Sequence, residues 1–232
     1  MAAKNSLKIY LPDHYYHLYN RGVEKRSIFQ DEQDYSVFLS YLRTYLPPKG
    51  EDKLRQALLT PNLNYKERER ILKELRLNNF SKEITLLAYC LMPNHFHFLV
   101  KQKSANSIDK FMNSLGVRYT MFFNKKYKRV GSLYQGVYKA VAVDSEEQLS
   151  YLSSYIHRNP LGLMTGTKDD VLRACFTQPS SYPDYLGRRK TNWVHPEDIL
   201  AFFSKTIPRL SYQAFIEQTD DIYIIEKLAI DP

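Results

Sequence analysis

The pattern of apolar and polar positions predicts a strand and a helix at the start of the chain. Residues 14–21 (HYYHLYNR) are aromatic and roughly alternating, which indicates a strand that ends at Asn20-Arg21-Gly22. Residues 31–46 carry apolar side chains at helical spacing and are followed by Pro47-Pro48-Lys49-Gly50, a combination that predicts a helix and its end.

A strand hairpin and a long helix are predicted in the middle of the chain. Residues 84–92 form an apolar run typical of a buried strand, Pro93-Asn94 is a turn signal, and residues 95–101 return as a second strand. Residues 107–124 then predict a helix with one apolar face. That face comprises Ile108, Phe111, Met112, Leu115, Tyr119 and Phe122.

The following residues add a second predicted hairpin and a further helix. Residues 131–143 carry glycines at turn positions and predict a hairpin, and residues 146–159 predict a helix that Pro160 stops. After Gly166 we expect short helical pieces and loops. Because strands and helices interleave, the chain predicts an α+β fold with a central antiparallel sheet.

A highly charged segment interrupts this series at about residues 50–80. It carries charge of both signs, and Ile71, Leu72 and Leu75 form a thin apolar face. The segment therefore predicts a helical insertion. Since its basic residues have acidic neighbours, a solvated surface is the expected role.

The composition is that of a globular intracellular protein. Hydrophobic residues make up 44% and charged residues 25% of the 232 residues, which argues against wholesale disorder. The two cysteines, Cys90 and Cys175, are too far apart to suggest a disulfide framework. The N-terminus lacks the apolar core of a secretory signal, and no stretch approaches the roughly 20 apolar residues needed to span a bilayer. We therefore expect a cytoplasmic protein with no membrane partner.

Positive charge is concentrated in one stretch of the chain. The net charge is +8, which permits a polyanionic partner. From Lys101 to Lys139 there are nine Lys and Arg residues against one acid, whereas from Pro196 to Pro232 seven acids face three bases. The 19 tyrosines and 12 phenylalanines include rings that can stack on unpaired bases, although most tyrosines pack in cores. Candidate DNA-binding residues are Arg21, Arg118, Lys125, Lys126 and Lys139.

Two histidines on the second strand of the central hairpin are candidate metal ligands. On a strand, positions i and i+2 project from the same face, so His95 and His97 share one side while Phe96 and Phe98 pack on the other. Two imidazoles on a rigid strand form half of a metal site. A histidine pair without a ligand is the plainer alternative.

A tyrosine and an asparagine on the predicted helix at 146–159 add to this chemistry. In YIHRNP (155–160), Tyr155 and Asn159 are one helical turn apart and share a face. A tyrosine hydroxyl can attack phosphorus, and a carboxamide oxygen can ligate a metal. Taken alone, the two residues are equally consistent with packing and with a helix stop.

Together the two elements fit the attack of a tyrosine on a DNA phosphodiester. A divalent ion held by His95, His97 and Asn159 would grip the non-bridging phosphate oxygens and act as a Lewis acid. Tyr155 would lose its proton as it attacks. The products would be a 5′-phosphotyrosine and a free 3′-hydroxyl, and a 3′-hydroxyl can later reverse the step and join a new strand.

The HFH motif at 95–97 and the later YIHRNP resemble the HUH, single-tyrosine family of IS200-like transposases, most closely the branch associated with repetitive extragenic palindromes (REP). The resemblance implies a ferredoxin-like palm, Mg²⁺ or Mn²⁺ as cofactor, and imperfect hairpins in single-stranded DNA as substrate. It also implies that His95 and His97 are metal ligands and Tyr155 the nucleophile. Asn159 would be the third ligand, where IS200-type relatives have glutamine. Further motifs that resemble the branch are YHLYNRG (16–22), DEQDYSVFLSYL (31–42), GSLYQGVYKA (131–140) and SSYPDYLG (180–187).

The resemblance extends over about residues 12–190. It predicts a transposase domain at 1–190 and a C-terminal extension at 191–232. The charged insertion and the acidic tail exceed the compact transposase core.

Alternatives to transposition follow from single residues. Tyr151 lies one turn before Tyr155, a spacing that resembles two-tyrosine rolling-circle nickases. A protein with this fold but without the chemistry would be a hairpin-binding regulator. HFHFLV also resembles the motif of histidine-triad enzymes, but Leu99 occupies the position of their nucleophilic histidine. Related transposases act as monomers or as dimers, so a monomer and a homodimer are both consistent with the resemblance.

Overall fold

The centre of the molecule is a four-stranded antiparallel sheet in the computed structural model, which describes residues 10–160 and 178–218. The strand order is β2-β3-β1-β4. One helix, α1 (Glu32–Tyr45), connects β1 to β2 by way of an insertion, and another, α4 (Ser107–Lys126), connects β3 to β4. This is the order of a ferredoxin-like palm and confirms the expected α+β fold. The strands are β1 (His14–Arg21), β2 (Ile84–Met92), β3 (His95–Gln102) and β4 (Lys139–Ala142).

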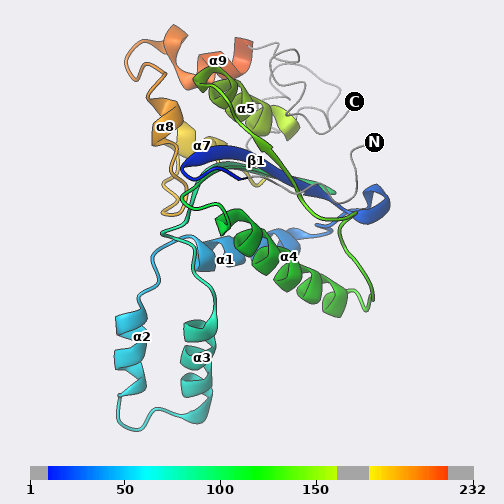
Figure 1. Ribbon diagram of the computed structural model, residues 1–232, viewed down its shortest axis with the longest axis vertical. Coiled ribbons are helices and arrows are strands. Elements are labelled where there is room, and N and C mark those ends of the chain that lie inside the picture. Colours follow the sequence, from blue (N-terminus) through cyan, green and yellow to red (C-terminus); the bar gives the residue numbers. More distant parts are fainter. Residues whose placement is uncertain (1–9, 161–177, 219–232) are drawn as a thin grey trace.

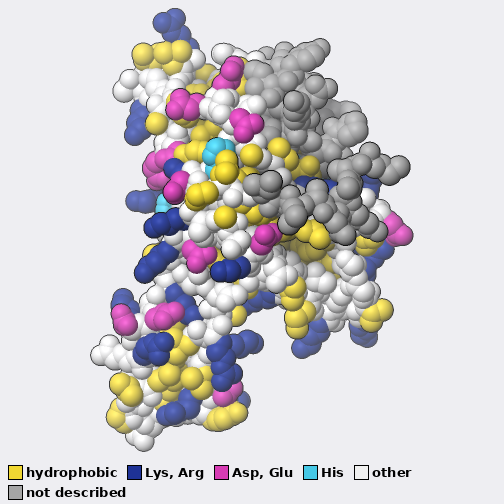
Figure 2. All heavy atoms as spheres, in the orientation of Figure 1, with side chains coloured by type: hydrophobic (Ala, Val, Ile, Leu, Met, Phe, Trp, Pro, Cys, Tyr) yellow, Lys and Arg dark blue, Asp and Glu magenta, His cyan; other side chains and the backbone are white. Residues whose placement is uncertain are grey.

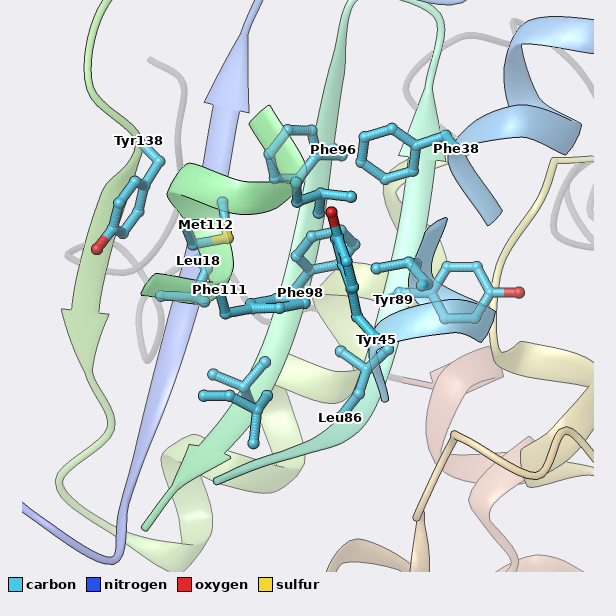
Figure 3. Packing of buried hydrophobic residues seen from close by; sticks show 14 of the residues in the cluster. Leu18, Phe38, Tyr45, Leu86, Tyr89, Phe96, Phe98, Phe111, Met112 and Tyr138 are labelled. Carbon is cyan, nitrogen blue, oxygen red and sulfur yellow. The ribbon is translucent and has the colours of Figure 1, made fainter. Parts of the chain in front are cut away.

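An aromatic core fills one face of the sheet. Helices α1 and α4 cover this face (Figure 1). Phe96 and Phe98 of β3 point into it together with Leu18 of β1 and the helix residues Phe38 and Phe111 (Figure 3). All five side chains are buried. The strand residues are buried because alternate positions of each strand are apolar on this side, and the helix residues because α1 and α4 turn their apolar faces to the sheet.

The opposite face is covered by α5 (Glu146–Arg158) and by the C-terminal segments (Figure 1). Ser145 caps α5 by accepting a hydrogen bond from the backbone N–H of Gln148. Leu152 and Ile156 of α5 share a second buried cluster with Leu99 of the sheet. The C-terminal elements are α7 (Tyr182–Tyr185), α8 (Glu197–Leu200), the 3₁₀ turn η3 (Pro208–Leu210) and α9 (Tyr212–Gln218).

The outer edge of β2 is covered by residues 178–195. Backbone hydrogen bonds join Leu91 N–H to the Pro179 carbonyl (3.0 Å) and Ser181 N–H to the Tyr89 carbonyl (3.0 Å). Further along, His195 N–H donates to the Leu86 carbonyl (2.9 Å). Several edge donors and acceptors of this strand are thereby paired, which protects it from other strands.

The charged segment forms a helical hairpin that projects from the body (Figures 1 and 2). It comprises α2 (Glu51–Leu58) and α3 (Tyr65–Arg76), and among their side chains only Ile71 is buried. Asn64 and Glu67 form a capping box at the start of α3. At the base, the Lys49 ammonium donates to the carbonyls of Leu75 (2.6 Å) and Leu77 (2.8 Å). The predicted helical insertion is confirmed.

The hairpin predicted at 131–143 is wrong. Only Lys139–Ala142 is a strand, and its partner is β1. The residues before β4 pair with the end of β1 and the residues just after it. Gln135 N–H donates to the Arg21 carbonyl, and Val23 N–H donates to the Leu133 carbonyl. The glycines therefore lie in turns, as Gly131 does at φ +87°. The backbone hydrogen bonds of this segment are made with the end of β1 and not within a local hairpin.

The remaining differences from the sequence predictions are small, and two of the residue sets discussed above cannot be placed. The helix continues to Lys126, and Phe123 rather than Phe122 is buried on its apolar face. The 3₁₀ turn η1 (Val23–Lys25) follows β1. Cys175 and the last part of the acidic tail (219–232) lie outside the described residues. Within the described ranges, none of the helices combines the length and the apolar character that crossing a membrane requires.

Candidate active site

Strand β3 presents His95 and His97 on the sheet face that α5 covers, opposite Phe96 and Phe98. His97 is fully buried and His95 is half-buried. The strand periodicity therefore has the consequence expected from the sequence: two imidazoles project side by side from a rigid support. Their ring centroids are 4.9 Å apart, in an edge-to-face arrangement.

Helix α5 brings Tyr155 and Asn159 to the same place. The half-buried Tyr155 ring meets the His97 ring edge-on, with centroids 5.5 Å apart. The amide oxygen of Asn159, at the C-terminal cap of α5, lies 3.1 Å from Nε2 of His95. The four residues, separated by up to 64 positions in the sequence, thus form one cluster.

Asn94, in the turn between β2 and β3, determines that Nδ1 of His95 carries a proton. The Asn94 amide nitrogen donates to the Lys25 carbonyl (3.3 Å), which directs its oxygen to Nδ1 of His95 at 2.6 Å. An amide oxygen only accepts, so Nδ1 of His95 carries the proton. The oxygen of Asn159, also an acceptor, lies against Nε2, so in the neutral form of the ring with its proton on Nδ1 a lone pair faces this oxygen. Two acceptors directed at one point are arranged as ligands of a cation are.

His97 adds a third acceptor. Its Nδ1 lies 2.9 Å from Nε2 of His17, whereas its buried Nε2 makes no well-formed hydrogen bond within the described residues, although Asn159 is close enough to act on the pKa of the ring. The pKa of His97 lies well below the usual histidine value, because burial disfavours the imidazolium and the neighbouring His17 and His95 add repulsion. The ring is therefore neutral, which is the form that binds metals.

The donor set fits a divalent cation. Two neutral imidazole nitrogens and one amide oxygen are ordinary metal ligands. Among the described residues, no group of three or more His, Cys, Asp or Glu side chains is placed to hold a metal. The candidate set is thus complete only with the amide of Asn159.

The five basic candidates divide between the two sides of the sheet. Arg21 pairs with His95 across β1 and β3, and the exposed Lys139 pairs with Tyr19, itself the partner of His97. Pairs that lie directly opposite each other share a face, so Arg21 and Lys139 lie on the side of the cluster.

The other three candidates are on α4, across the sheet. The Arg118 guanidinium stacks 4.0 Å over the ring of Tyr41 of α1. Lys126 forms ion pairs with Asp31 and Asp34, both at 2.7 Å. Lys125 is exposed. Arg118 and Lys126 therefore have structural contacts in the helical layer, away from His95 and His97.

Tyr151 and His157 face the C-terminal segments. The Tyr151 ring packs against Phe215 of α9, with centroids 5.2 Å apart. His157 is buried, with Nδ1 2.7 Å from the Tyr212 hydroxyl and Nε2 2.7 Å from the Ser181 hydroxyl. Burial lowers the pKa of His157 to about 3, so it is a neutral bridge. These contacts hold α5 against the residues that follow it.

Comparisons with known proteins match the part of the chain that carries this cluster to one family. Residues 53–159 match the family described as "Transposase IS200 like", and the match includes all four residues of the cluster. Over this stretch the chain is similar to the IS200-like transposases. The resemblance of its motifs to these transposases is confirmed. No curated protein matches the chain.

Two solved structures are similar to this chain at low sequence identity. One is a REP-associated tyrosine transposase bound to a REP hairpin, with 11% identity, a TM-score of 0.49, and coverage of 83% of this chain and 92% of that chain. The other is the tRNA(His) guanylyltransferase of Saccharomyces cerevisiae, with 13% identity, a TM-score of 0.27, and 75% of each chain covered.

Three residues that lie at the candidate site were not predicted from the sequence to belong to it. Asn94 and His17 contact the outer nitrogens of His95 and His97, and the Tyr19 ring lies 6.2 Å from the His97 ring. His17 and Tyr19 alternate on β1 as His95 and His97 do on β3. That alternation could have predicted that the two side chains share a face of β1. The register that places them opposite the histidines of β3 could not be predicted from the sequence.

Proposed function

We propose that the protein cleaves and rejoins single-stranded DNA at hairpins through a covalent 5′-phosphotyrosine on Tyr155. The observation that carries the proposal is the meeting of the Tyr155 ring with a cluster of three metal-type donors, His95, His97 and Asn159. The match of residues 53–159 to the IS200-like transposase family makes DNA processing the activity to expect.

The bond changes balance without a further reactant. The Tyr155 hydroxyl oxygen forms a bond to phosphorus as the bond from phosphorus to the 3′ oxygen breaks. The tyrosine proton passes to solvent and the departing 3′ oxygen takes one up, so a 3′-hydroxyl leaves. Because the phosphodiester energy is kept in the tyrosine ester, a 3′-hydroxyl can reverse the reaction and join a new strand.

His95, His97 and Asn159 would hold Mg²⁺ or Mn²⁺. When bound, the ion supplies Lewis-acid polarisation of the phosphate. The protein's own part is to keep both imidazoles neutral and fixed, through Asn94 and His17, and to place Tyr155 beside them. Arg21 and Lys139, on the same face, are proposed contacts to the flanking phosphates.

The proposed substrate is a single strand folded into a REP-like hairpin. The support is the resemblance of several motifs to the REP-associated branch, including YHLYNRG at 16–22, together with the net charge of +8. The packing of Tyr151 against Phe215 favours one nucleophile over the two-tyrosine nickase.

The test is the covalent adduct itself. Full-length protein is incubated with Mn²⁺ and hairpin oligonucleotides drawn from the flanks of its coding region, and the adduct is mapped by mass spectrometry. We expect a 5′-phosphate on Tyr155, its loss in Tyr155→Phe, and its retention in Tyr151→Phe, which displaces no group at the cluster. Attachment at Tyr151 would support the two-tyrosine nickase. Binding without an adduct for every hairpin would support a regulator, and a 3′ linkage would overturn the proposed chemistry.

A further inference from the structure

His17 is the buried partner of a candidate metal ligand. It lies on β1, and its Nε2 is 2.9 Å from Nδ1 of His97 on β3. The two rings are stacked, with centroids 5.1 Å apart and an interplanar angle of 12°. Both side chains are fully buried. The contact is thus a hydrogen bond held in a fixed place by the sheet.

Only one proton fits between these two nitrogens. In one arrangement His97 donates from Nδ1 and His17 accepts at Nε2, which leaves Nε2 of His97 with a lone pair. In the other arrangement His17 donates, and the neutral His97 ring must carry its proton on Nε2. The hydrogen bond therefore determines which nitrogen of His97 is available to a metal.

The surroundings of His97 favour the first arrangement. Its Nε2 is buried and makes no well-formed hydrogen bond to the described residues, although Asn159 is close enough to act on the pKa of His97. A proton on this nitrogen would be a buried donor without a well-aligned acceptor, since the Asn159 oxygen already faces Nε2 of His95 at 3.1 Å. A lone pair there would instead be ready for a cation beside His95 and Asn159, whose facing atoms are both acceptors.

We propose that His17 is a positioning residue: it accepts the proton of His97 Nδ1 and so keeps His97 Nε2 open as a metal ligand. The inference rests on the proposed metal site of His95, His97 and Asn159. His17 is not itself a ligand through Nε2, because that nitrogen is occupied by His97. Histidine ligands elsewhere are commonly oriented by an acceptor for their second ring nitrogen.

The test measures Mn²⁺ binding to the full-length protein, without DNA, by the EPR signal of the free ion. In His17→Gln an amide oxygen can replace the accepting nitrogen, whereas His17→Leu offers no acceptor at similar bulk. We expect Leu to weaken Mn²⁺ binding about 10- to 100-fold and Gln to restore most of it, while thermal melts show both variants folded. A purely structural role would change the melting temperature and leave the affinity of the folded protein unchanged.

His97→Ala separates this inference from the proposed function. If His97→Ala loses Mn²⁺ and His17→Leu binds as the wild type does, the role of His17 is overturned and the metal site stands. If His97→Ala binds Mn²⁺ fully, the proposed metal site itself fails. Should His17→Leu not fold, the ¹⁵N shifts of the metal-free wild-type protein decide: a protonated Nδ1 on His97 supports the inference, and a protonated Nε2 overturns it.

Discussion

At the scale of single residues, the site depends on which ring nitrogens hold lone pairs. The amide oxygen of Asn94 accepts a hydrogen bond from Nδ1 of His95, and Nε2 of His17 lies within hydrogen-bond distance of Nδ1 of His97. Both contacts leave the Nε2 atoms for the cluster with Asn159. In the proposed metal site each histidine therefore has one partner at Nδ1 and would hold the ion through Nε2, so removing either ring removes one of the three proposed ligand atoms.

His95→Ala or His97→Ala should lower DNA cleavage by at least about 100-fold, since the Lewis-acid contribution is lost with the ligand. Hairpin affinity should change little, because phosphate contacts supply most of it. Cleavage of a labelled hairpin in Mn²⁺ and fluorescence anisotropy measure the two quantities. His195→Ala is the control, since this side chain is exposed beside Glu197 on α8. Full cleavage by either variant with Mg²⁺ or Mn²⁺ supplied would exclude the metal assignment.

The sequence predicted the residues of the cluster more readily than their contacts. A period of two on β3 places His95 and His97 together, and a helical turn places Tyr155 and Asn159 together, because both are local rules. The contact of Asn159 with His95 depends on how α5 docks on the sheet, which is tertiary packing. The hydrogen bond between His17 and His97 depends on strand register. No local pattern specifies either.

At the scale of elements, α2–α3 and α9 contribute very differently to stability. The α2–α3 hairpin buries only Ile71, and its base is held by Lys49 and the adjacent backbone. Helix α9 instead buries Tyr212 and Ile216 against α5, and the Tyr212 hydroxyl bonds His157 and Ser153. The first element is an appendage, and the second supports the helix that carries Tyr155.

Replacing residues 51–76 by a Gly-Ser linker of about four residues should therefore change the free energy of unfolding by no more than about 1 kcal/mol. Tyr212→Ala should cost about 3–5 kcal/mol, because it leaves a cavity and removes a buried hydrogen bond. Urea denaturation measures both. A large loss on removing the hairpin would mean that it packs on the body in a way its exposure does not indicate.

The failed hairpin prediction at 131–143 has a cause at this same scale. Glycines mark turns, but they do not determine which strand the segment after the turn pairs with. The hydrogen bonds of β4 go to β1, more than a hundred positions earlier, and not to its own neighbours. The β2–β3 hairpin was predictable because its two strands are joined by the turn itself.

At the scale of the whole molecule, the sheet separates two roles. One face holds the aromatic core under α1 and α4, and the other holds the cluster under α5. Much of the positive charge of 101–139 lies on α4, where Lys126 and Arg118 have structural contacts. The basic side chains on the side of the cluster, Arg21 and Lys139, are therefore the first ones to test for DNA contact.

DNA binding should be salt-dependent and should prefer a hairpin with single-stranded flanks to a blunt duplex. Each neutralised phosphate releases counterions, so the slope of log affinity against log salt should fall in magnitude by roughly 0.7 to 0.9 in Lys139→Ala. Lys53→Ala is the matched control, an exposed lysine on the projecting hairpin, and should leave the slope unchanged. Anisotropy titrations across a salt series measure both variants.

Equal affinity for a hairpin and a blunt duplex at one ionic strength would contradict a single-strand substrate. An unchanged slope in Lys139→Ala would remove this lysine from the DNA path and leave Arg21 as the basic contact beside His95.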